Sequence, residues 1–225
     1  MWQRARTDEQ RRTRVHSILS AAAALFDRLP YEEVSLGKIA GAAGFTRSNL
    51  YRYFNSREEI FLELYRMDLD TWLSEFTAEM DAESAHRLAA ASLSAADRLT
   101  NLVALWTQVL LRQDRLMRLT PLLSISLERN SSEEQYRAFK EFTAELMQRA
   151  AAIIRRWVPA LSDSTLYRFF LVHQALVAGA APMCRYNEMQ RRVLEAPSLS
   201  HLRVDFERLY SSVMLAYLRG AEADE

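Results

Sequence analysis

The sequence predicts an all-α protein, and three observations carry that prediction. Apolar residues recur at three- and four-residue spacing through most of the 225-residue chain, as they do on one face of a helix. No stretch alternates convincingly between apolar and polar residues, which is the pattern of a half-buried strand. Five glycines and five prolines are too few for a turn-rich β-sandwich or barrel.

Composition narrows the class of protein further. Hydrophobic residues make up 49% of the chain, which excludes a disordered polypeptide and is enough for a sizeable core. Cys184 is the single cysteine, so neither an internal disulfide nor a cysteine-based zinc site is expected. No apolar run approaches the length of about 18 residues that a membrane-spanning helix needs, and no secretory signal is recognisable. We therefore expect a cytoplasmic protein.

Caps and breakers predict four helices in the first third of the chain. A capping-box pattern opens the first helix at Thr7, and another opens the fourth at Ser56. Ser35 and Thr46 cap the two short helices between them. Gly44 closes the first of these two, because the residue after a helix often needs a positive φ. The predicted helices span residues 7–29, 35–43, 47–54 and 56–80.

The helical pattern continues to the end of the sequence, with prolines as kinks or ends. We expect further helices at about residues 94–112, 114–128, 132–157, 163–181 and 200–219.

Residues 35–54 read as a helix-turn-helix, whose second helix is short enough to enter the major groove of DNA. Leu50 and Phe54 are four residues apart and must pack inward, so the polar residues around them project outward toward phosphates and base edges. Residues 1–58 hold ten Lys/Arg against six Asp/Glu, a basic excess on a chain of zero net charge. The alternative is a helical hairpin whose polar face is merely solvated. Exposed tyrosines on that face disfavour this alternative.

From about Arg11 to Tyr65 the chain resembles the DNA-binding domain of TetR-family transcriptional regulators. The matching motifs are VSLxxIAxxAGFT at residues 34–46 and LYRYFxSREEIF at residues 50–61. The resemblance implies a helix-turn-helix DNA-binding domain at residues 1–56 and a helical effector-binding and dimerisation domain at residues 57–225. It further implies a homodimer that represses transcription from an inverted-repeat operator in double-stranded DNA and releases it when a small hydrophobic molecule binds.

Residue by residue, the resemblance yields a set of expected DNA contacts. Lys38 is expected at a phosphate, and Arg57 stands where the family commonly has a phosphate-binding lysine. The positions expected to face DNA are Thr46, Arg47, Ser48, Asn49, Tyr51 and Tyr53.

The body of the chain offers candidates for an effector pocket and a dimer interface. Pocket candidates are the large aromatic, methionine and histidine side chains Trp72, Phe76, Trp106, Met117, Phe142, Met147, Phe169, His173 and Met183. The resemblance implies that the last two long helices form the dimer interface, with Leu166, Phe170, Val177, Ala180, Phe206, Leu209, Val213 and Tyr217. Both sets have the spacing of an ordinary helical core, and that alternative stays open.

No catalytic constellation is recognisable. The four histidines are widely separated, and no metalloprotease motif, phosphate-binding glycine loop or nucleophile elbow is present. We expect no enzyme activity, no metal site and no cofactor. The second functional hypothesis is an all-α protein-interaction or ligand-binding module that never binds DNA, and salt-sensitive DNA binding would distinguish the two.

Overall fold

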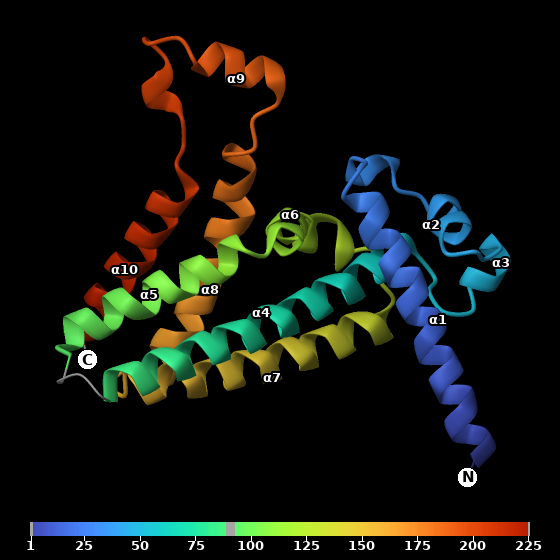
Figure 1. Cartoon of the computed structure of the whole chain (residues 1–225), viewed down its shortest axis with the longest axis horizontal. Helices are drawn as coiled ribbons and strands as arrows, with labels where there is room; N and C mark the ends of the chain where they lie inside the picture. The colour runs from blue at the N-terminus through green and yellow to red at the C-terminus, as the bar shows by residue number, and fades with distance from the viewer. Residues whose placement is uncertain (1, 89–92, 225) are drawn as a thin grey trace. The chain divides into compact units, whose positions relative to one another are not determined.

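The computed structural model describes residues 2–88 and 93–224, and every regular element in those ranges is a helix (Figure 1). The elements are α1 (Trp2–Phe26), the 3-10 turn η1 (Tyr31–Glu33), α2 (Leu36–Ala42), α3 (Arg47–Leu50), α4 (Arg57–Leu88), α5 (Ala95–Leu111), α6 (Asp114–Leu122), the π-helical turn η2 (Leu123–Leu127), α7 (Glu133–Trp157), α8 (Asp163–Met183), α9 (Glu188–Leu194), the 3-10 turn η3 (Ser200–Leu202) and α10 (Phe206–Asp224). The all-α prediction is confirmed.

The chain divides into two compact units. The first comprises the chain up to Met67 together with Leu122–Phe142, and the second comprises Asp68–Pro121 and the chain from Thr143 onward. Helices α4 and α7 each contribute to both units. The division differs from the expected boundary at residue 56, because the first turns of α4 bury Ile60 and Phe61 with the helix-turn-helix.

The core of the first unit explains the position of the helix-turn-helix. The apolar stripe of α1 buries Ile18 and Phe26, and α1 packs on α2, which packs on α3. Phe26, Tyr31 and Phe61 meet edge to face, with ring centroids 5.1–6.5 Å apart. Such aromatic contacts add to the free energy of burial and fix ring orientations. These contacts hold the start of α4 against α1 and η1.

The caps predicted for the short helices are present. The Ser35 side chain accepts a hydrogen bond from the backbone amide of Lys38 at 3.3 Å, and Thr46 accepts one from Asn49 at 3.2 Å. Gly44 has a φ of 74°, in the left-handed region that a glycine adopts without strain.

Three helix boundaries differ from the sequence-based expectation. Helix α1 begins at Trp2, so the capping box predicted at Thr7 was wrong. Helix α3 ends at Leu50 and continues as a turn, and α10 begins at Phe206 rather than near residue 200. The predictions for α3 and α10 had extended the helices over turns that share the same apolar spacing.

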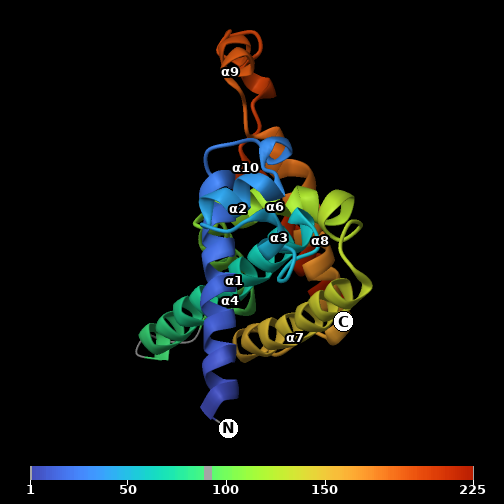
Figure 2. The same ribbon diagram turned by 90° about the vertical axis from the view of Figure 1, so that its right-hand side faces the viewer.

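In the second unit, α5 and α8 pack against α10, with Trp106, Phe169 and Tyr210 fully buried. Between α8 and α10 the chain forms α9 and η3, which the sequence did not predict. These two elements stand away from the core of α5, α8 and α10 in both views (Figures 1 and 2). Across residues 2–88 and 93–224, no helix is both long and apolar enough to cross a membrane.

Candidate nucleic-acid interface

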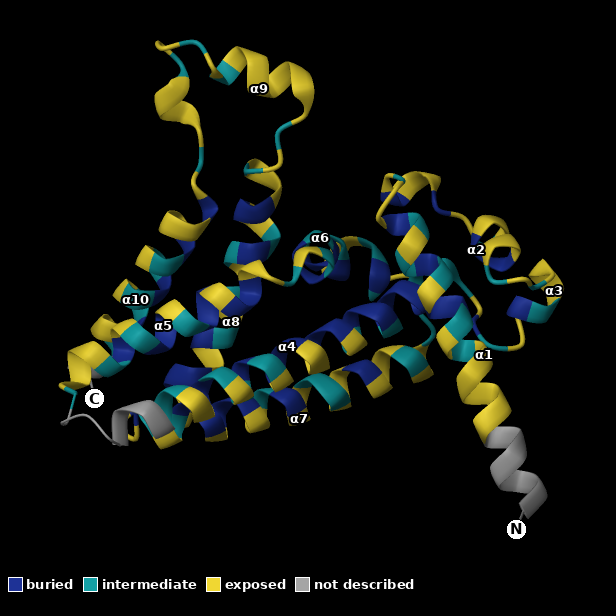
Figure 3. Cartoon of the chain, viewed as in Figure 1, coloured by how far each residue is buried: buried dark blue, intermediate teal, exposed yellow. Residues whose placement is uncertain are grey.

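Helix α3 presents a polar face to solvent while its apolar side is anchored. Leu50 is fully buried and Phe54 is 5% exposed, as the sequence pattern predicted. The residues expected at DNA are exposed or partly exposed, and they are Lys38, Thr46, Arg47, Ser48, Asn49, Tyr51 and Tyr53. Figure 3 shows this mixture of yellow and teal over α2 and α3. The exposed face of α3 is therefore accessible to a DNA groove.

Hydrogen bonds and ring contacts order this face. Arg47 Nη2 donates to Tyr51 Oη at 3.1 Å, and the guanidinium carbon lies 5.7 Å from the centre of the Tyr51 ring. The hydroxyls of Thr46 and Ser48 are hydrogen bonded at 3.1 Å. Because these donors and acceptors are already positioned, binding loses less side-chain entropy than it would from a mobile surface.

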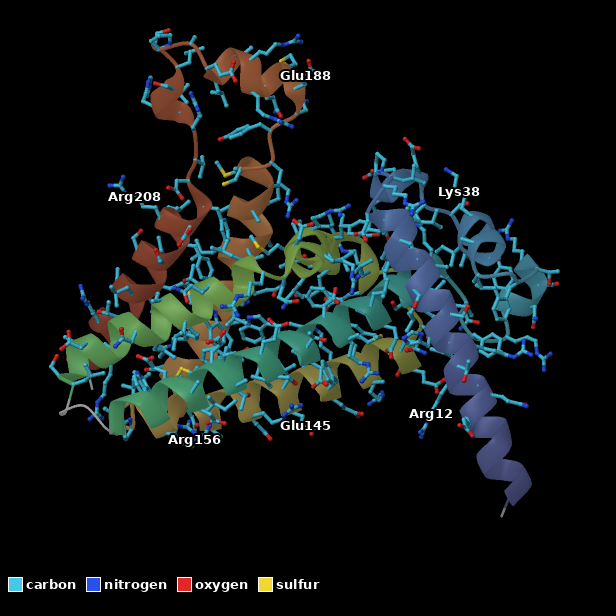
Figure 4. The ribbon with its side chains drawn as sticks, viewed as in Figure 1. Arg12, Lys38, Glu145, Arg156, Glu188 and Arg208 are labelled. Carbon is cyan, nitrogen blue, oxygen red and sulfur yellow. The ribbon has the colours of Figure 1, made fainter. Side chains whose placement is uncertain are left out.

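Lys38 lies on α2 beside this face. Its side chain is exposed, and no carboxylate forms an ion pair with it in the ranges that the structure describes (Figure 4). An exposed ammonium group that pairs with no carboxylate of the described chain can attract a phosphate oxygen as a point charge.

Arg57 differs from its sequence-based assignment. Its Nη1 donates to the carbonyl oxygens of Tyr31 at 3.0 Å and Val34 at 2.9 Å, and its Nε donates to Glu58 at 2.9 Å. The guanidinium also lies over the Tyr31 ring, 4.4 Å from its centre. The guanidinium therefore joins η1 to the start of α4, and we propose this structural role for Arg57 in place of the expected phosphate contact.

Sequence reasoning missed a second set of contacts at the start of α4. The buried Glu59 carboxylate accepts hydrogen bonds from the backbone amides of Asn55 at 2.8 Å and Ser132 at 3.2 Å. Ser56 Oγ donates to the carbonyl of Asn130 at 3.2 Å. These bonds join the helix-turn-helix to the turn before α7, and their partners are too distant in sequence for any pattern to reveal them.

An aromatic cluster in the second unit brings together five of the nine pocket candidates. Trp106 lies at its centre, with ring centroids 4.5 Å from Trp72, 5.0 Å from Phe76, 5.0 Å from Phe169 and 5.5 Å from His173. The rings come from α4, α5 and α8. The cluster is apolar apart from its ring nitrogens and the hydroxyl of Tyr210.

A polar chain runs through the cluster. Trp106 Nε1 donates to Tyr210 Oη at 2.9 Å, and Tyr210 Oη is hydrogen bonded to His173 Nδ1. The Trp106 Nε1 donor also lies 3.3 Å from His173 Nδ1. Burial lowers the pKa of His173 to about 4 and raises the pKa of Tyr210 well above its ordinary value.

Trp72 contributes a buried donor that its surroundings do not satisfy. Its Nε1 has no hydrogen-bond partner among residues 2–88 and 93–224, although the residue is only 3% exposed. Leaving a buried donor unpaired costs about 1–3 kcal/mol. The Trp72 ring stacks on His173, with centroids 6.0 Å apart and planes 21° apart.

The remaining pocket candidates are dispersed. Met117 is buried in α6, and Phe142 lies in the first unit with the Arg66 guanidinium carbon 5.2 Å from its ring centre. Met147 lines a groove between α7 and α8, and Met183 is exposed at the end of α8. The structure therefore does not group these four with the aromatic cluster.

The residues expected at a dimer interface differ in exposure. The chain itself buries Leu166, Val177, Ala180 and Phe206 to 8% exposure or less, which favours the alternative of an ordinary core for these four. Phe170, Val213 and Tyr217 are partly buried, and Leu209 is exposed. The outward face of α8 instead carries Tyr167 and Leu171, one position further along the helix.

A helix-turn-helix with an exposed recognition helix, joined to a larger helical unit, defines a DNA-binding transcriptional regulator. The family model described as "Bacterial regulatory proteins, tetR family" matches residues 18–64, and "Tetracyclin repressor-like, C-terminal domain" matches residues 67–225. The chain belongs to the TetR family of transcriptional regulators. Members of this family bind DNA and typically dimerise, and the family is one of regulators rather than enzymes.

Curated relatives align with part of the chain. The chain is 34% identical over 88 residues to the uncharacterized HTH-type transcriptional regulator YfiR of Bacillus subtilis, covering 39% of this chain and 41% of YfiR. It is 37% identical over 62 residues to the HTH-type transcriptional regulator RutR of Escherichia coli, covering 28% and 29%. The alignments thus span less than half the length of these relatives.

Solved structures resemble the chain over most of its length. The fatty acid degradation regulator FadR of Bacillus halodurans superposes with a TM-score of 0.54 at 17% identity, covering 90% of this chain and 94% of FadR. A regulator of the TetR/AcrR family from Thermobifida fusca gives 0.52 at 20% identity, covering 92% and 98%. At these identities the likeness establishes the fold alone.

Proposed function

We propose that the protein is a ligand-responsive repressor that binds a palindromic operator as a homodimer and releases it when a small hydrophobic molecule binds. The observation that carries the DNA half of this proposal is the ordered polar face of α3. Thr46, Arg47 and Tyr51 are held by their own hydrogen bonds, while buried Leu50 fixes the helix beneath them.

The roles within the interface follow from side-chain chemistry. Lys38 and Arg47 contact phosphates, which fixes register without reading sequence. Ser48, Asn49 and Tyr51 at the start of α3 reach base edges, because the first residues of a recognition helix meet the groove floor. Two such helices in a symmetric dimer read an inverted repeat, with half-sites separated by about one helical turn of 34–36 Å or a multiple.

The aromatic cluster is the proposed effector region. Trp72 Nε1 is a buried donor without a protein acceptor among the described residues, and its ring stacks on that of His173. An apolar molecule with one hydrogen-bond acceptor, such as a carbonyl oxygen, would satisfy this donor and displace no existing bond. Burial keeps His173 neutral near pH 7, so the region offers no positive charge to a ligand.

Helix α4 links the two proposed sites within the chain. It contributes Glu59 to the first unit and Trp72 to the second as one continuous helix from Arg57 to Leu88. A ligand that favours one arrangement of α4 changes operator affinity, and linkage requires the operator to change ligand affinity by the same factor. We expect this factor to be about 5–150.

The test of the function has two arms. Selection from a random DNA pool should recover an inverted repeat, whose binding weakens steeply with salt; no salt-sensitive DNA binding would favour the alternative of a helical module that does not act on DNA. A screen for compounds that release the operator should then yield an apolar effector. Its affinity, measured by calorimetry with and without operator, should differ by the reciprocal factor. Equal affinities would overturn the ligand-responsive half of the proposal.

A further inference from the structure

The segment between α8 and α10, residues 184–205, has no buried residue. We call this segment the arm. Every residue of the arm is exposed or partly exposed, whereas α8 and α10 bury residues on both sides of it (Figure 3). Fixing a backbone costs about 1–2 kcal/mol per residue, and burial normally offsets that cost. Within its own chain the arm gains no such burial.

The arm is nevertheless internally ordered. Asn187 and Gln190 form a reciprocal capping box at the start of α9. The backbone amide of Val204 donates to Tyr186 Oη at 2.9 Å, and Arg203 Nε donates to the carbonyl of Leu194 at 3.0 Å. These bonds tie the two ends of the arm together. The arm is thus a shaped element whose outer surface is available for packing.

That outer surface is apolar in part. Met189 and Val193 are four residues apart on α9, so they lie on one face of the helix, and they are 56% and 49% exposed. Leu202 on η3 is 55% exposed. Large apolar side chains gathered on one ordered projection indicate a surface that packs on another molecule.

The same unit contains an apolar groove without an occupant. The groove lies between α7 and α8, has a volume of about 310 Å³, and is lined by Ala144, Met147, Gln148, Ala151, Arg155, Asp163, Leu166, Tyr167 and Phe170. Most of its lining residues are apolar, and an Arg155–Asp163 ion pair lies among the polar ones. Side chains of the size of methionine and valine would fit a groove of this volume.

The arm cannot fill the groove of its own chain. Tyr217 Oη donates to the carbonyl of Thr165, and Tyr210 Oη meets His173 Nδ1, so α8 and α10 run antiparallel and the arm leaves from their common far end. On α8 the groove is lined from Asp163 to Phe170, which lie 20 and 13 residues from Met183, or about 30 Å and 20 Å of helix. Met189 follows Met183 by six residues, which span about 20 Å at most when fully extended. Because part of this stretch belongs to the helix α9, which rises less per residue, Met189 does not reach the middle of the groove.

We propose that the arm packs on a second copy of the chain, with the Met189–Val193 face of α9 lying in the α7–α8 groove of that copy. Two copies related by a two-fold axis with antiparallel α8 helices bring the far end of one α8 to the near end of the other. Tyr167 lines the groove, and Leu171 is exposed one helical turn further toward the arm, so the two continue the same contact.

This inference rests on the homodimer of the proposed function, and its test needs neither operator nor effector. Sedimentation velocity should show the wild-type chain as a dimer at micromolar concentration. The double variant Met189→Asp, Val193→Asp should weaken dimerisation by at least about tenfold, because it buries two charges in an apolar groove. Ser198→Asp adds a charge to an exposed part of the arm and should leave the dimer unchanged.

A cross-link between different chains gives an independent readout. In a Cys184→Ser background, chains carrying Val193→Cys are mixed with chains carrying Met147→Cys and oxidised. We expect a disulfide-linked species of twice the chain mass that needs both variants. If the wild-type chain is a dimer, but the cysteine variants do not cross-link and the two aspartates do not weaken dimerisation, the arm contact alone is overturned. A wild-type monomer would overturn both the arm contact and the homodimer.

Discussion

The Glu59 carboxylate accepts a hydrogen bond from the backbone amide of Ser132, 73 residues further along the chain, at 3.2 Å. The same carboxylate accepts from the amide of Asn55 at 2.8 Å. Glu59 therefore joins three segments: the turn after α3, the start of α4 and the turn before α7. Burial alone raises the pKa of Glu59, but the hydrogen bonds from Asn55 and Ser132 outweigh it and hold the pKa below its ordinary value.

Glu59→Gln should lower the free energy of unfolding by about 1.5–3 kcal/mol at pH 7, the usual worth of hydrogen bonds to a charged group. The folded protein binds fewer protons at Glu59 than the unfolded chain does. The stabilisation is therefore present above the ordinary value of 4.5 and is lost as pH falls through the lowered folded pKa. Urea unfolding over a pH series from 7 downward measures this, with exposed Glu33→Gln as the control. A gap between Glu59→Gln and wild type that does not narrow at any pH below 4.5 would contradict the assignment.

Lys38→Ala should weaken binding to all DNA sequences alike and reduce the slope of log K against log salt concentration by about one, because one phosphate contact is lost. Fluorescence anisotropy over a salt series provides the measurement. An altered preference at a single base pair would instead assign Lys38 to base readout.

Arg57→Ala should behave differently from Lys38→Ala. Removing the guanidinium takes away the bonds to the carbonyls of Tyr31 and Val34 and the stacking on Tyr31. We expect a loss of about 2 kcal/mol in unfolding free energy, within the range for charged hydrogen bonds, and an unchanged salt slope. A reduced slope with unchanged stability would restore Arg57 as a phosphate contact.

Asn49→Ala should relax sequence preference at one base pair of each half-site and cost about 1–3 kcal/mol in operator affinity. An amide side chain can pair with a base edge through two hydrogen bonds, and alanine makes none. Binding to a panel of single-base operator variants reads this out. Asn101→Ala makes the same chemical change in α5 and should leave the panel unaltered. Uniform weakening across the panel would place Asn49 at the DNA backbone.

The unfolding free energy should decline between pH 7 and pH 4 by up to about 3 kcal/mol through His173. Its pKa is lowered to about 4 by burial, so the unfolded chain binds the proton first. The stabilisation is complete above the unfolded value of 6.5 and disappears as pH falls through the folded one. His173→Asn keeps an acceptor for Tyr210 and removes the titrating ring. If wild type and variant lose stability in parallel over this range, His173 is protonated freely in the folded protein.

Local interactions were predictable from the sequence, and contacts between distant segments were not. Ser35, Thr46 and Gly44 act on residues within a turn of themselves, so their side-chain chemistry alone indicates their roles. The burial of Leu50 and Phe54 follows from helical spacing, and that spacing fixed which polar residues face outward. The candidate DNA surface was predictable for this reason.

Contacts between distant residues were not visible in the sequence. The bonds of Arg57 to the carbonyls of Tyr31 and Val34 are of this kind, and they favour a structural role over the expected phosphate contact. Apolar residues occupy most sides of α8, so their spacing did not show that Leu166 is buried within the chain and that Tyr167 is exposed. The arm was missed because α9 has no buried face and so leaves no periodic pattern.

Because the first unit is assembled from two stretches of chain, exchange of DNA-binding specificity between family members requires two breakpoints. A chimera that grafts residues 1–56 onto another body leaves behind the start of α4 and Leu122–Phe142, which the first unit includes. The residues at positions 57 and 59 would then come from a foreign sequence, although Tyr31, Val34 and Asn55, to which Arg57 and Glu59 are hydrogen bonded, are grafted. A transplant that retains both stretches keeps the hydrogen bonds from Ser132 and to Asn130, and is the one we expect to carry a working operator preference with it.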